Sequence, residues 1–430
     1  MRIERTRSRA RRRWSRFGGR PKVCVSVLGV SRKRTSVLVR AGRRQGQDRG
    51  SSDYPTARSK STHRPGTPLS PPRLPPPPRQ LPKTRRRKMS DESIWPSATT
   101  VGRLSRRDAA AYLARLNLPH SLLDSPPSLD LLRQLQSAHV LAVPFESLSI
   151  HVGNWHDDEA DVNLGGGELV GLGDKAFNRI VNLNRGGFCF SANSSFATFL
   201  RYWDFRVSEC AARVFSHLRK DPEETGFSWE PTSHQISVVD WDGSNGRYFA
   251  DIGFGSGNCV YPIPFHDGAT QTSIPSDDFF ELRCTDRLPG SSSHLQPDMN
   301  PYWTVWRRAA RADGSSYMSP LYSFVLQSVA AVDFAVLNNY QYSSTNSRFR
   351  TMLVSTVLRS NGERRTLVYL GGMTDDEGKK AAKVYTMTAV EEGKREEEKE
   401  IEWVPMRVGP MRRVLERDFG MRFPTDYAGN

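Results

Sequence analysis

The chain has 430 residues, a formal net charge of +16 and five cysteines. The charge is unevenly distributed, because residues 1–88 hold 27 of the 62 Lys and Arg residues but only 3 of the 46 Asp and Glu residues. The remainder is mildly acidic, with 35 basic and 43 acidic residues, so the overall charge does not indicate that the folded part binds nucleic acid. The length allows two or three domains with hydrophobic cores.

The cysteines and the apolar segments exclude further classes. No two cysteines form a CxxC pair or a spacing typical of a zinc site, so we expect a reduced protein without a metal. No apolar run has the length of a transmembrane helix, and the first apolar stretch, VCVSVLGV, is short and lies between arginines, unlike a secretory signal. We therefore predict a cytoplasmic protein that does not associate with a membrane.

Residues 1–88 have the composition of a disordered extension, rich first in Arg and Ser and then in Pro. Three interpretations are open: a basic interaction tail, an organelle-targeting presequence, or a segment that is not translated. We favour the third, because charge, proline content and sequence complexity all change next to Met89.

Residues 100–205 carry a helical pattern and are predicted to form a helical domain. In LSRRDAAAYLARLNL, Ser105 and Asp108 have the spacing of a capping box, and apolar residues recur on one helical face. A second helix is predicted in SLDLLRQLQSAHVLA, before Pro144, and a third just after Cys189. The glycine-rich LGGGELVGLGD between them indicates a loop, and it lacks the Lys-Ser/Thr ending of a phosphate loop.

From residue 206 to 330 the hydrophobic period changes towards two, which predicts a β domain. HQISVVDWDGSNGRYFADIGFG has the pattern of a hairpin, and YWTVWRR and LYSFVLQ have that of further strands. Residues 331–430 combine a strand pair, a charged insertion near 373–400 that we expect to be solvated, and a terminal helix in PMRRVLERDFGMRF.

The segment NRGGFCFSANSSFATFL places Cys189 after two glycines and at the predicted start of a helix. Adjacent glycines are typical of a sharp turn or a close approach. The N–H groups at a helix start favour a thiolate, which is the nucleophilic form of cysteine. The alternative is a small buried hydrophobic residue, which most free cysteines are. Cys210, Cys259 and Cys284 are expected to be inert.

The predicted hairpin brings His234 and Asp251 to the same face. If Asp242 and Gly243 form a two-residue turn, His234 lies directly opposite Asp251. Lengthening the loop to GSNG shifts the pair apart along the strands but leaves both side chains on one face. Two interpretations stay open: a structural pair, or a general base and its orienting carboxylate beside Cys189 as nucleophile.

Five segments in the same order resemble the arylamine N-acetyltransferase family over most of residues 104–425. RGGFC, which ends at Cys189, resembles the family's Arg-Gly-Gly-x-Cys motif, while SHQISVV and DIGFG resemble the segments that carry its histidine and aspartate. AHVLAVPFESLSI is similar to its VPFEN segment, and NNYQYSSTNSRFRTMLV to the stretch that contributes to coenzyme A binding, although the proline of that stretch is missing here.

The resemblance implies a multi-domain α+β fold, with an N-terminal helical bundle, a central β-barrel and a C-terminal α/β lid around a cysteine-protease-like catalytic core. It also implies transfer of an acetyl group from acetyl-CoA, or of another acyl group from its acyl-CoA, to an arylamine or arylhydrazine by a ping-pong mechanism. The catalytic residues would then be Cys189, His234 and Asp251. The expected coenzyme contacts are Val214, Phe215, Tyr340 and Ser347, and the expected arene contacts are Phe145 and Phe188.

Arg185 has two candidate roles: contact with a coenzyme phosphate, or an ion pair that holds the loop before the nucleophile. We favour the ion pair, with Glu146 as partner, because buried guanidinium groups are usually satisfied by carboxylates.

Two other functional classes stay open. A cysteine protease or transglutaminase would use the same three residues without depending on coenzyme A, and a non-catalytic protein would act through the basic tail. The partners we expect are a small arylamine and an acyl-CoA, with no nucleic acid bound by the folded part. The sequence does not indicate which acyl donor is used, which amine is acylated, or the oligomeric state.

Overall fold

The computed structural model describes residues 104–242, 246–275, 278–292, 299–311, 313–388 and 397–424. The chain divides into two compact units, Met1–Arg85 and Arg86–Asn430, and every described residue belongs to the second unit. The predictions made for residues 1–88, and for the tip of the hairpin turn at 243–245, lie outside the described residues.

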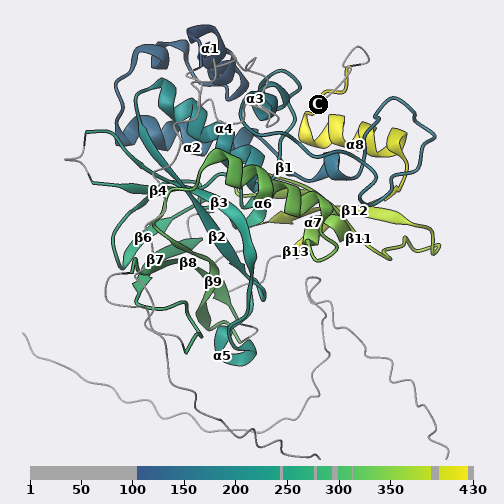
Figure 1. The fold of residues 1–430 in the computed structure, drawn as a ribbon. Coiled ribbons are helices and arrows are strands. Elements are labelled where there is room, and N and C mark those ends of the chain that lie inside the picture. The colour runs from purple at the N-terminus through teal and green to yellow at the C-terminus, as the bar shows by residue number, and fades with distance from the viewer. Residues whose placement is uncertain are drawn as a thin grey trace, which may run out of the picture. The chain divides into compact units, whose positions relative to one another are not determined.

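The N-terminal part of the second unit is helical, as the sequence pattern predicts (Figure 1). Ser105 caps the first helix and forms both hydrogen bonds of a capping box with Asp108. The second helix ends at Ala142, two residues before Pro144. One helix was missed, because the short α3 follows directly on glycines that indicate a loop. The helices are α1 (Arg106–Arg115), η1 (His120–Asp124), α2 (Leu129–Ala142), η2 (Leu148–Ile150), α3 (Asp174–Val181) and α4 (Cys189–Tyr202).

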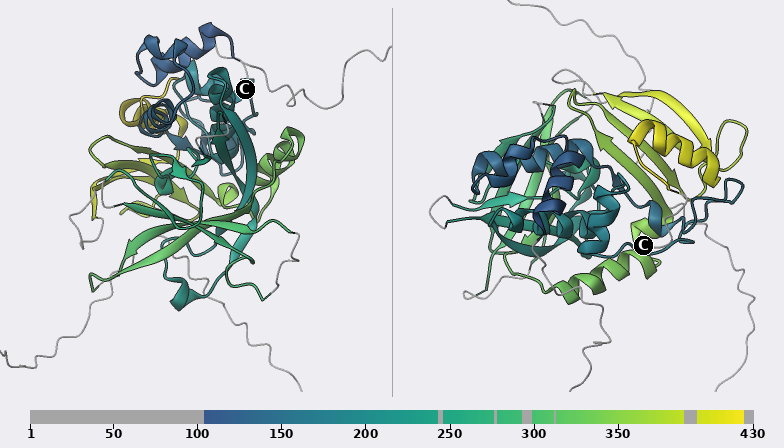
Figure 2. Two further views of the ribbon diagram at one scale, coloured as in Figure 1. Left: turned by 90° about the vertical axis from the view of Figure 1, so that its left-hand side faces the viewer. Right: turned by 90° about the horizontal axis from the view of Figure 1, so that it is seen from above.

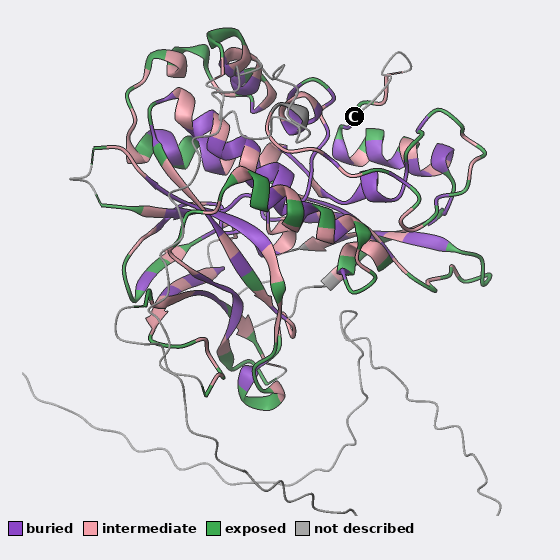
Figure 3. Cartoon of the chain, in the orientation of Figure 1, coloured by how far each residue is buried: buried purple, intermediate pink, exposed green. Residues whose placement is uncertain are grey.

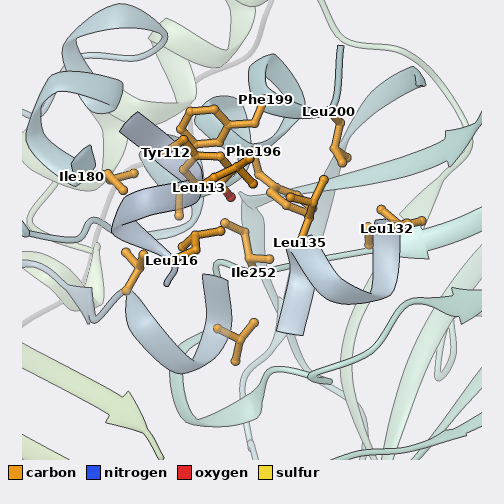
Figure 4. Packing of buried hydrophobic residues seen from close by; sticks show 14 of the residues in the cluster. Tyr112, Leu113, Leu116, Leu132, Leu135, Ile180, Phe196, Phe199, Leu200 and Ile252 are labelled. Atoms are coloured by element: carbon orange, nitrogen blue, oxygen red, sulfur yellow. The ribbon is translucent and has the colours of Figure 1, made fainter. Parts of the chain in front are cut away.

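The helices α1, η1, α2, α3 and α4 share one apolar core, which Figure 4 shows from close by. Figure 3 shows the buried residues of the described chain in purple. Tyr112 of α1 stacks on Phe199 of α4, and Leu135 of α2 is fully buried in the same cluster. Ile252 reaches this core from the segment directly after Asp251. Each such side chain contributes about 1.5–3 kcal/mol on burial. The core therefore fixes α4 and the residue next to Asp251 relative to each other.

The central part of the described chain is an eight-stranded antiparallel sheet in the order β5-β4-β3-β2-β9-β8-β7-β6. Its edge strands β5 and β6 contact each other, so the sheet is nearly closed and barrel-like. This confirms the mixed helical and β fold class and the predicted barrel. The strands are β2 (Arg206–Phe215), β3 (Trp229–Asp240), β4 (Tyr248–Ala250), β5 (Ile263–Pro264), β6 (Ala269–Thr272), β7 (Phe279–Thr285), β8 (Tyr302–Ala310) and β9 (Ser316–Val325); α5 (Pro222–Thr225) and η3 (Gly255–Gly257) lie in the connections.

Side chains of the barrel strands form a second core. Cys210, Ile236, Phe249, Phe280 and Phe324 are buried in it together. Burial raises the pKa of Cys210 to about 11. A thiol with that pKa stays protonated at neutral pH, in agreement with the expectation that this cysteine is inert.

A five-stranded antiparallel sheet follows, in the order β1-β10-β11-β12-β13. The edge strand β1 comes from the helical part of the sequence, which ties that part to the C-terminal sheet. The helix α8 packs on this sheet through Met411 and Leu415, while α6 crosses in front of the barrel (Figures 1 and 2). The elements are β1 (Phe145–Glu146), α6 (Ala331–Ser343), α7 (Arg348–Thr351), β10 (Met352–Leu358), β11 (Arg364–Leu370), β12 (Ala381–Thr388), β13 (Glu397–Pro405) and α8 (Val408–Phe419).

The predicted charged insertion near 373–400 contains more regular structure than its composition indicates. Residues 381–388 form β12, and β13 begins at residue 397; residues 389–396 lie outside the described part of the chain. Lys383 of β12 forms an ion pair with Glu398 of β13, so oppositely charged side chains face each other across the two strands.

Candidate active site

Cys189 is the first residue of α4, and Phe188 is its N-cap. The two glycines before Phe188 permit close contacts: a Cβ on Gly186 would lie 1.6 Å from the carbonyl oxygen of Pro144, and a Cβ on Gly187 would lie 2.1 Å from Oγ of Ser191. The contact of Gly186 is with backbone and excludes a side chain, whereas a side chain at position 187 would require the hydroxyl of Ser191 to move. The glycines therefore let the loop run against β1 and α4 and deliver the cysteine to the helix start.

His234 of β3 and Asp251, just after β4, form a buried pair. Nε2 of His234 lies 2.8 Å from Oδ2 of Asp251, and each side chain is 2% exposed. In the observed register Ser237 is opposite Ala250, which shifts His234 by two residues from the position that a two-residue turn predicts. The shift corresponds to the longer loop, and both side chains remain on one face as expected.

Cys189 lies beside this pair. The sulfur of Cys189 donates to the carbonyl oxygen of Ser233, the residue before His234, over 3.6 Å, and its interaction with the imidazole of His234 contributes to raising the pKa of that imidazole. Because Nε2 of His234 is bonded to Asp251, the interaction with the sulfur uses Nδ1. The structure thus brings together the three residues that the sequence analysis selected.

The electrostatics of the pair favour a charged histidine. Burial lowers the pKa of His234, but the charge of Asp251 and the hydrogen bonds with Asp251 and Cys189 outweigh burial and raise it to about 10. Burial likewise raises the pKa of Asp251, but the net shift is downward because of the charge of His234 and the hydrogen bonds from His234, Asn193 and the amide of Gly253. At neutral pH the pair is therefore an imidazolium and a carboxylate.

Two further residues interact with the carboxylate, and sequence reasoning gave neither a role. Asn193 donates from Nδ2 to Oδ1 of Asp251 over 2.8 Å and accepts from the amide of Ile252 over 3.0 Å. The ring centroid of Tyr322 of β9 lies 4.6 Å from that of His234, and burial, followed by its interaction with Asp251, raises the pKa of Tyr322. A sequence signal existed for Asn193, because it comes four residues after Cys189 and therefore lies on the same helix face. No such signal existed for Tyr322.

The DIGFG segment packs against the start of α4 next to Cys189. A Cβ on Gly253 would lie 2.7 Å from Cα of Cys189, so the backbone of this segment lies directly on the first turn of α4. The ring of Phe254 meets the ring of His234 edge-on, with centroids 5.0 Å apart. These contacts leave His234 little freedom to rotate away from the sulfur.

Glu146, which the sequence analysis pairs with Arg185, forms its ion pair with a different residue. Glu146 is buried and forms its ion pair with Arg179 of α3, whose Nε also donates to the carbonyl oxygen of Gly186 over 2.9 Å. Arg185 lowers the pKa of Glu146 through its charge, and its guanidinium lies over the rings of Trp155 and Phe423. The partner assignment is corrected from Arg185 to Arg179. It was missed because α3 itself was missed.

The expected arene contacts lie close to the nucleophile. Phe188 is fully buried, with its ring centroid 5.2 Å from that of Phe349, and it shares an apolar cluster with Cys189. Phe145 is half-buried beside the same Phe349 ring. Phe145 also lines a small pocket together with Ile252 and Gly255, which belong to the wall after Asp251.

The expected coenzyme contacts are spread over three elements, β2, α6 and the start of α7. Val214 and Phe215 end β2; Val214 is half-buried, whereas Phe215 is fully buried against Trp229. Tyr340 is half-buried on α6, and Ser347 is the buried N-cap of α7. The structure therefore buries Phe215 and Ser347 and leaves Val214 and Tyr340 partly exposed.

Among the described residues, no helix combines the length and the apolar composition that crossing a bilayer requires.

Known proteins match both the sequence and the fold. A profile described as N-acetyltransferase matches residues 128–397, more than half of the chain. An arylamine N-acetyltransferase of Mycobacterium tuberculosis is 28% identical over 251 residues, which are 58% of this chain and 74% of that protein. The N-malonyltransferase FDB2 of Fusarium pseudograminearum is 23% identical over 292 residues, covering 62% of this chain and 78% of that protein. The solved arylamine N-acetyltransferase of Salmonella typhimurium has the same fold, with a TM-score of 0.52 and 20% identity over 75% of this chain and 94% of that one.

The barrel-like fold and these matches define an enzyme of the acyltransferase class. Within that class, the chain belongs to the arylamine N-acetyltransferase family, as the resemblance of its five segments predicts.

Proposed function

We propose that the protein transfers an acyl group from an acyl-CoA to the nitrogen of an arylamine or arylhydrazine, through a thioester on Cys189. The observation that carries the proposal is the contact of the Cys189 sulfur with an imidazole that Asp251 keeps protonated. A thiolate beside an imidazolium is a strong nucleophile at neutral pH, and acyl transfer between two sulfur atoms is close to balanced in free energy.

In the first half-reaction, the thiolate of Cys189 attacks the carbonyl carbon of the acyl-CoA thioester. The tetrahedral intermediate collapses when its bond to the coenzyme sulfur breaks, and His234 gives its proton to that leaving thiolate. The products are free coenzyme A, an acylated Cys189 and a neutral His234. The N–H of Cys189, at the positive end of α4, is a candidate donor to the oxyanion of the intermediate.

In the second half-reaction, the amine nitrogen attacks the thioester on Cys189 and neutral His234 accepts the proton that the nitrogen loses. The carbon–sulfur bond then breaks, which releases the N-acyl product and restores the thiolate and the imidazolium. An arylamine is uncharged at neutral pH and can attack directly, whereas an aliphatic amine is protonated. The chemistry itself thus favours arylamines.

The substrates are assigned to the two sides of the nucleophile. The arene would contact Phe145 and Phe188, which share the ring of Phe349 as a neighbour. The coenzyme would contact α6 and α7 at Tyr340 and Ser347, with Val214 from the end of β2. In this arrangement the helical part supplies the nucleophile, the barrel supplies His234 and Asp251, and the C-terminal part forms the lid.

The proposal is tested by intact-mass analysis of the purified protein mixed with acetyl-, propionyl- or malonyl-CoA; malonyl-CoA is included because the relative FDB2 is named an N-malonyltransferase. We expect the mass of one acyl group on the wild type, its removal by an added arylamine, and no addition on Cys189→Ser. Unmodified wild-type protein with all three donors, or cleavage of a peptide amide without coenzyme A, would contradict the proposal and favour a cysteine hydrolase.

A further inference from the structure

Gln341 of α6 contacts the strand that carries the histidine, one residue before it. Its Nε2 donates to the carbonyl oxygen of Ser233 over 2.7 Å, and the residue is 4% exposed. The same carbonyl oxygen lies 3.6 Å from the sulfur of Cys189. One backbone oxygen therefore faces both the amide of Gln341 and the nucleophile.

A second hydrogen bond fixes the orientation of that amide. Oγ of Ser347 accepts from the amide of Phe349 over 3.2 Å and lies 2.8 Å from Oε1 of Gln341, so its hydroxyl proton is directed to Oε1. The carbonyl oxygen of Ser233 can only accept, which requires the NH₂ group of Gln341 on that side. The hydrogen bonds with Ser347 and with Ser233 therefore require the same orientation of the Gln341 amide.

The carbonyl oxygen affects the two protonation states of Cys189 differently. A thiol can donate a weak hydrogen bond to the oxygen of Ser233, whereas a thiolate has no proton to donate and meets the negative end of the C=O dipole. A donor on the same oxygen reduces its negative potential. It also prevents the peptide group from turning towards or away from the sulfur.

We propose that Gln341 is a positioning residue for the nucleophile: by binding the carbonyl oxygen of Ser233, it holds the backbone before His234 in place and favours the anionic form of Cys189. This inference rests on the proposed thiol mechanism. It extends that mechanism to the C-terminal part, because Ser347, Gln341 and Ser233 form a continuous chain of hydrogen bonds from the start of α7 to the nucleophile.

The test is the rate at which iodoacetamide alkylates Cys189 between pH 5 and 9, followed by intact mass without coenzyme A. Gln341→Met removes the donor and keeps the length of the side chain. We expect alkylation at pH 7 to be about three- to tenfold slower than in the wild type, because the loss of one net hydrogen bond corresponds to a factor of this size. The pH at which the rate is half-maximal should also be higher. Ser347→Ala keeps the amide but removes its anchor, and a smaller change in the same direction is expected.

Gln136→Met is the matched control, because Gln136 is also buried and donates to a backbone carbonyl oxygen, that of Cys259, over 3.1 Å. We expect this variant to lose stability without any change in the pH profile of alkylation. If Gln341→Met and Ser347→Ala both match the wild-type profile, Gln341 has only a structural role. If the wild type itself has no rapidly alkylated cysteine that is absent in Cys189→Ser, the proposed function fails instead.

Discussion

Asn193 and His234 bind opposite oxygens of one carboxylate: Asn193 donates to Oδ1 of Asp251 over 2.8 Å, and His234 lies 2.8 Å from Oδ2. Nδ2 of Asn193 also donates to the carbonyl oxygen of Gln235 on β3. The helix that begins at Cys189 is thereby joined to both strands that position its partners. The geometry of the site depends on this amide as well as on Cys189, His234 and Asp251.

We expect Asn193→Ala to lower both stability and the rate of acylation. Asp251 would lose a donor and the amide of Ile252 an acceptor, both buried, which predicts a loss of about 1–3 kcal/mol in the free energy of unfolding. The freed carboxylate would also orient His234 less well. Urea unfolding and single-turnover acylation measure the two effects.

Asn361→Ala, in an exposed turn, is the control and should change stability by less than about 0.5 kcal/mol. Equal effects of the two variants would contradict this role.

The stability of the protein should fall at alkaline pH because of His234. Its pKa rises from 6.5 to about 10 in the folded protein, so the folded state binds this proton more tightly than the unfolded chain does. The resulting stabilisation is fully present below pH 6.5 and is lost as the pH rises towards about 10. We expect urea unfolding midpoints to fall over this window in the wild type and to fall less in His234→Gln. Parallel curves for the two proteins would show that His234 does not gain its proton on folding.

Gly253→Ala should inactivate the enzyme with only a moderate loss of stability. The added methyl would lie 2.7 Å from Cα of Cys189, so the DIGFG segment or the start of α4 must move. Such overpacking costs about 1–3 kcal/mol, while a displacement of this size at the nucleophile costs on the order of a hundredfold in rate. Gly371→Ala is the control, since its added Cβ would meet only Leu164, at 3.9 Å. Full acyl transfer by Gly253→Ala would show that the contact is not tight.

Glu146 should be coupled more strongly to Arg179 than to Arg185. Arg179 forms the buried ion pair, whereas Arg185 acts on Glu146 through its charge while lying over two aromatic rings. Removing one partner of a buried pair costs about 3–5 kcal/mol, so Glu146→Gln and Arg179→Met should each be strongly destabilising and far from additive when combined. Double-mutant cycles on urea unfolding measure the two couplings. A larger coupling with Arg185 would restore the partner expected from the sequence.

Local sequence signals predicted the elements that carry Cys189, His234 and Asp251. Three helix boundaries were predictable, because each depends on residues within one helical turn. They are the capping box of α1, the end of α2 before Pro144 and the start of α4 at Cys189. The shared face of His234 and Asp251 followed from the period of two in a hairpin, for a loop of two residues or of four. The length of that loop was not predictable, since several turn types fit the residues Asp-Gly-Ser-Asn-Gly.

The sequence by itself therefore determined where helices and strands alternate, which residue types stand at the helix start and on the hairpin, and, through the order of five motifs, the family. Only the tertiary structure decided that Arg179 rather than Arg185 forms the ion pair with Glu146, that Tyr322 and Asn193 interact with Asp251, and that Gln341 reaches the carbonyl oxygen beside the sulfur. The physical reason is the separation along the chain of the residues that interact. Caps, turns and alternation are set by neighbours a few residues apart, whereas the partner of a buried polar group is whichever donor or acceptor the packing of distant segments delivers to it.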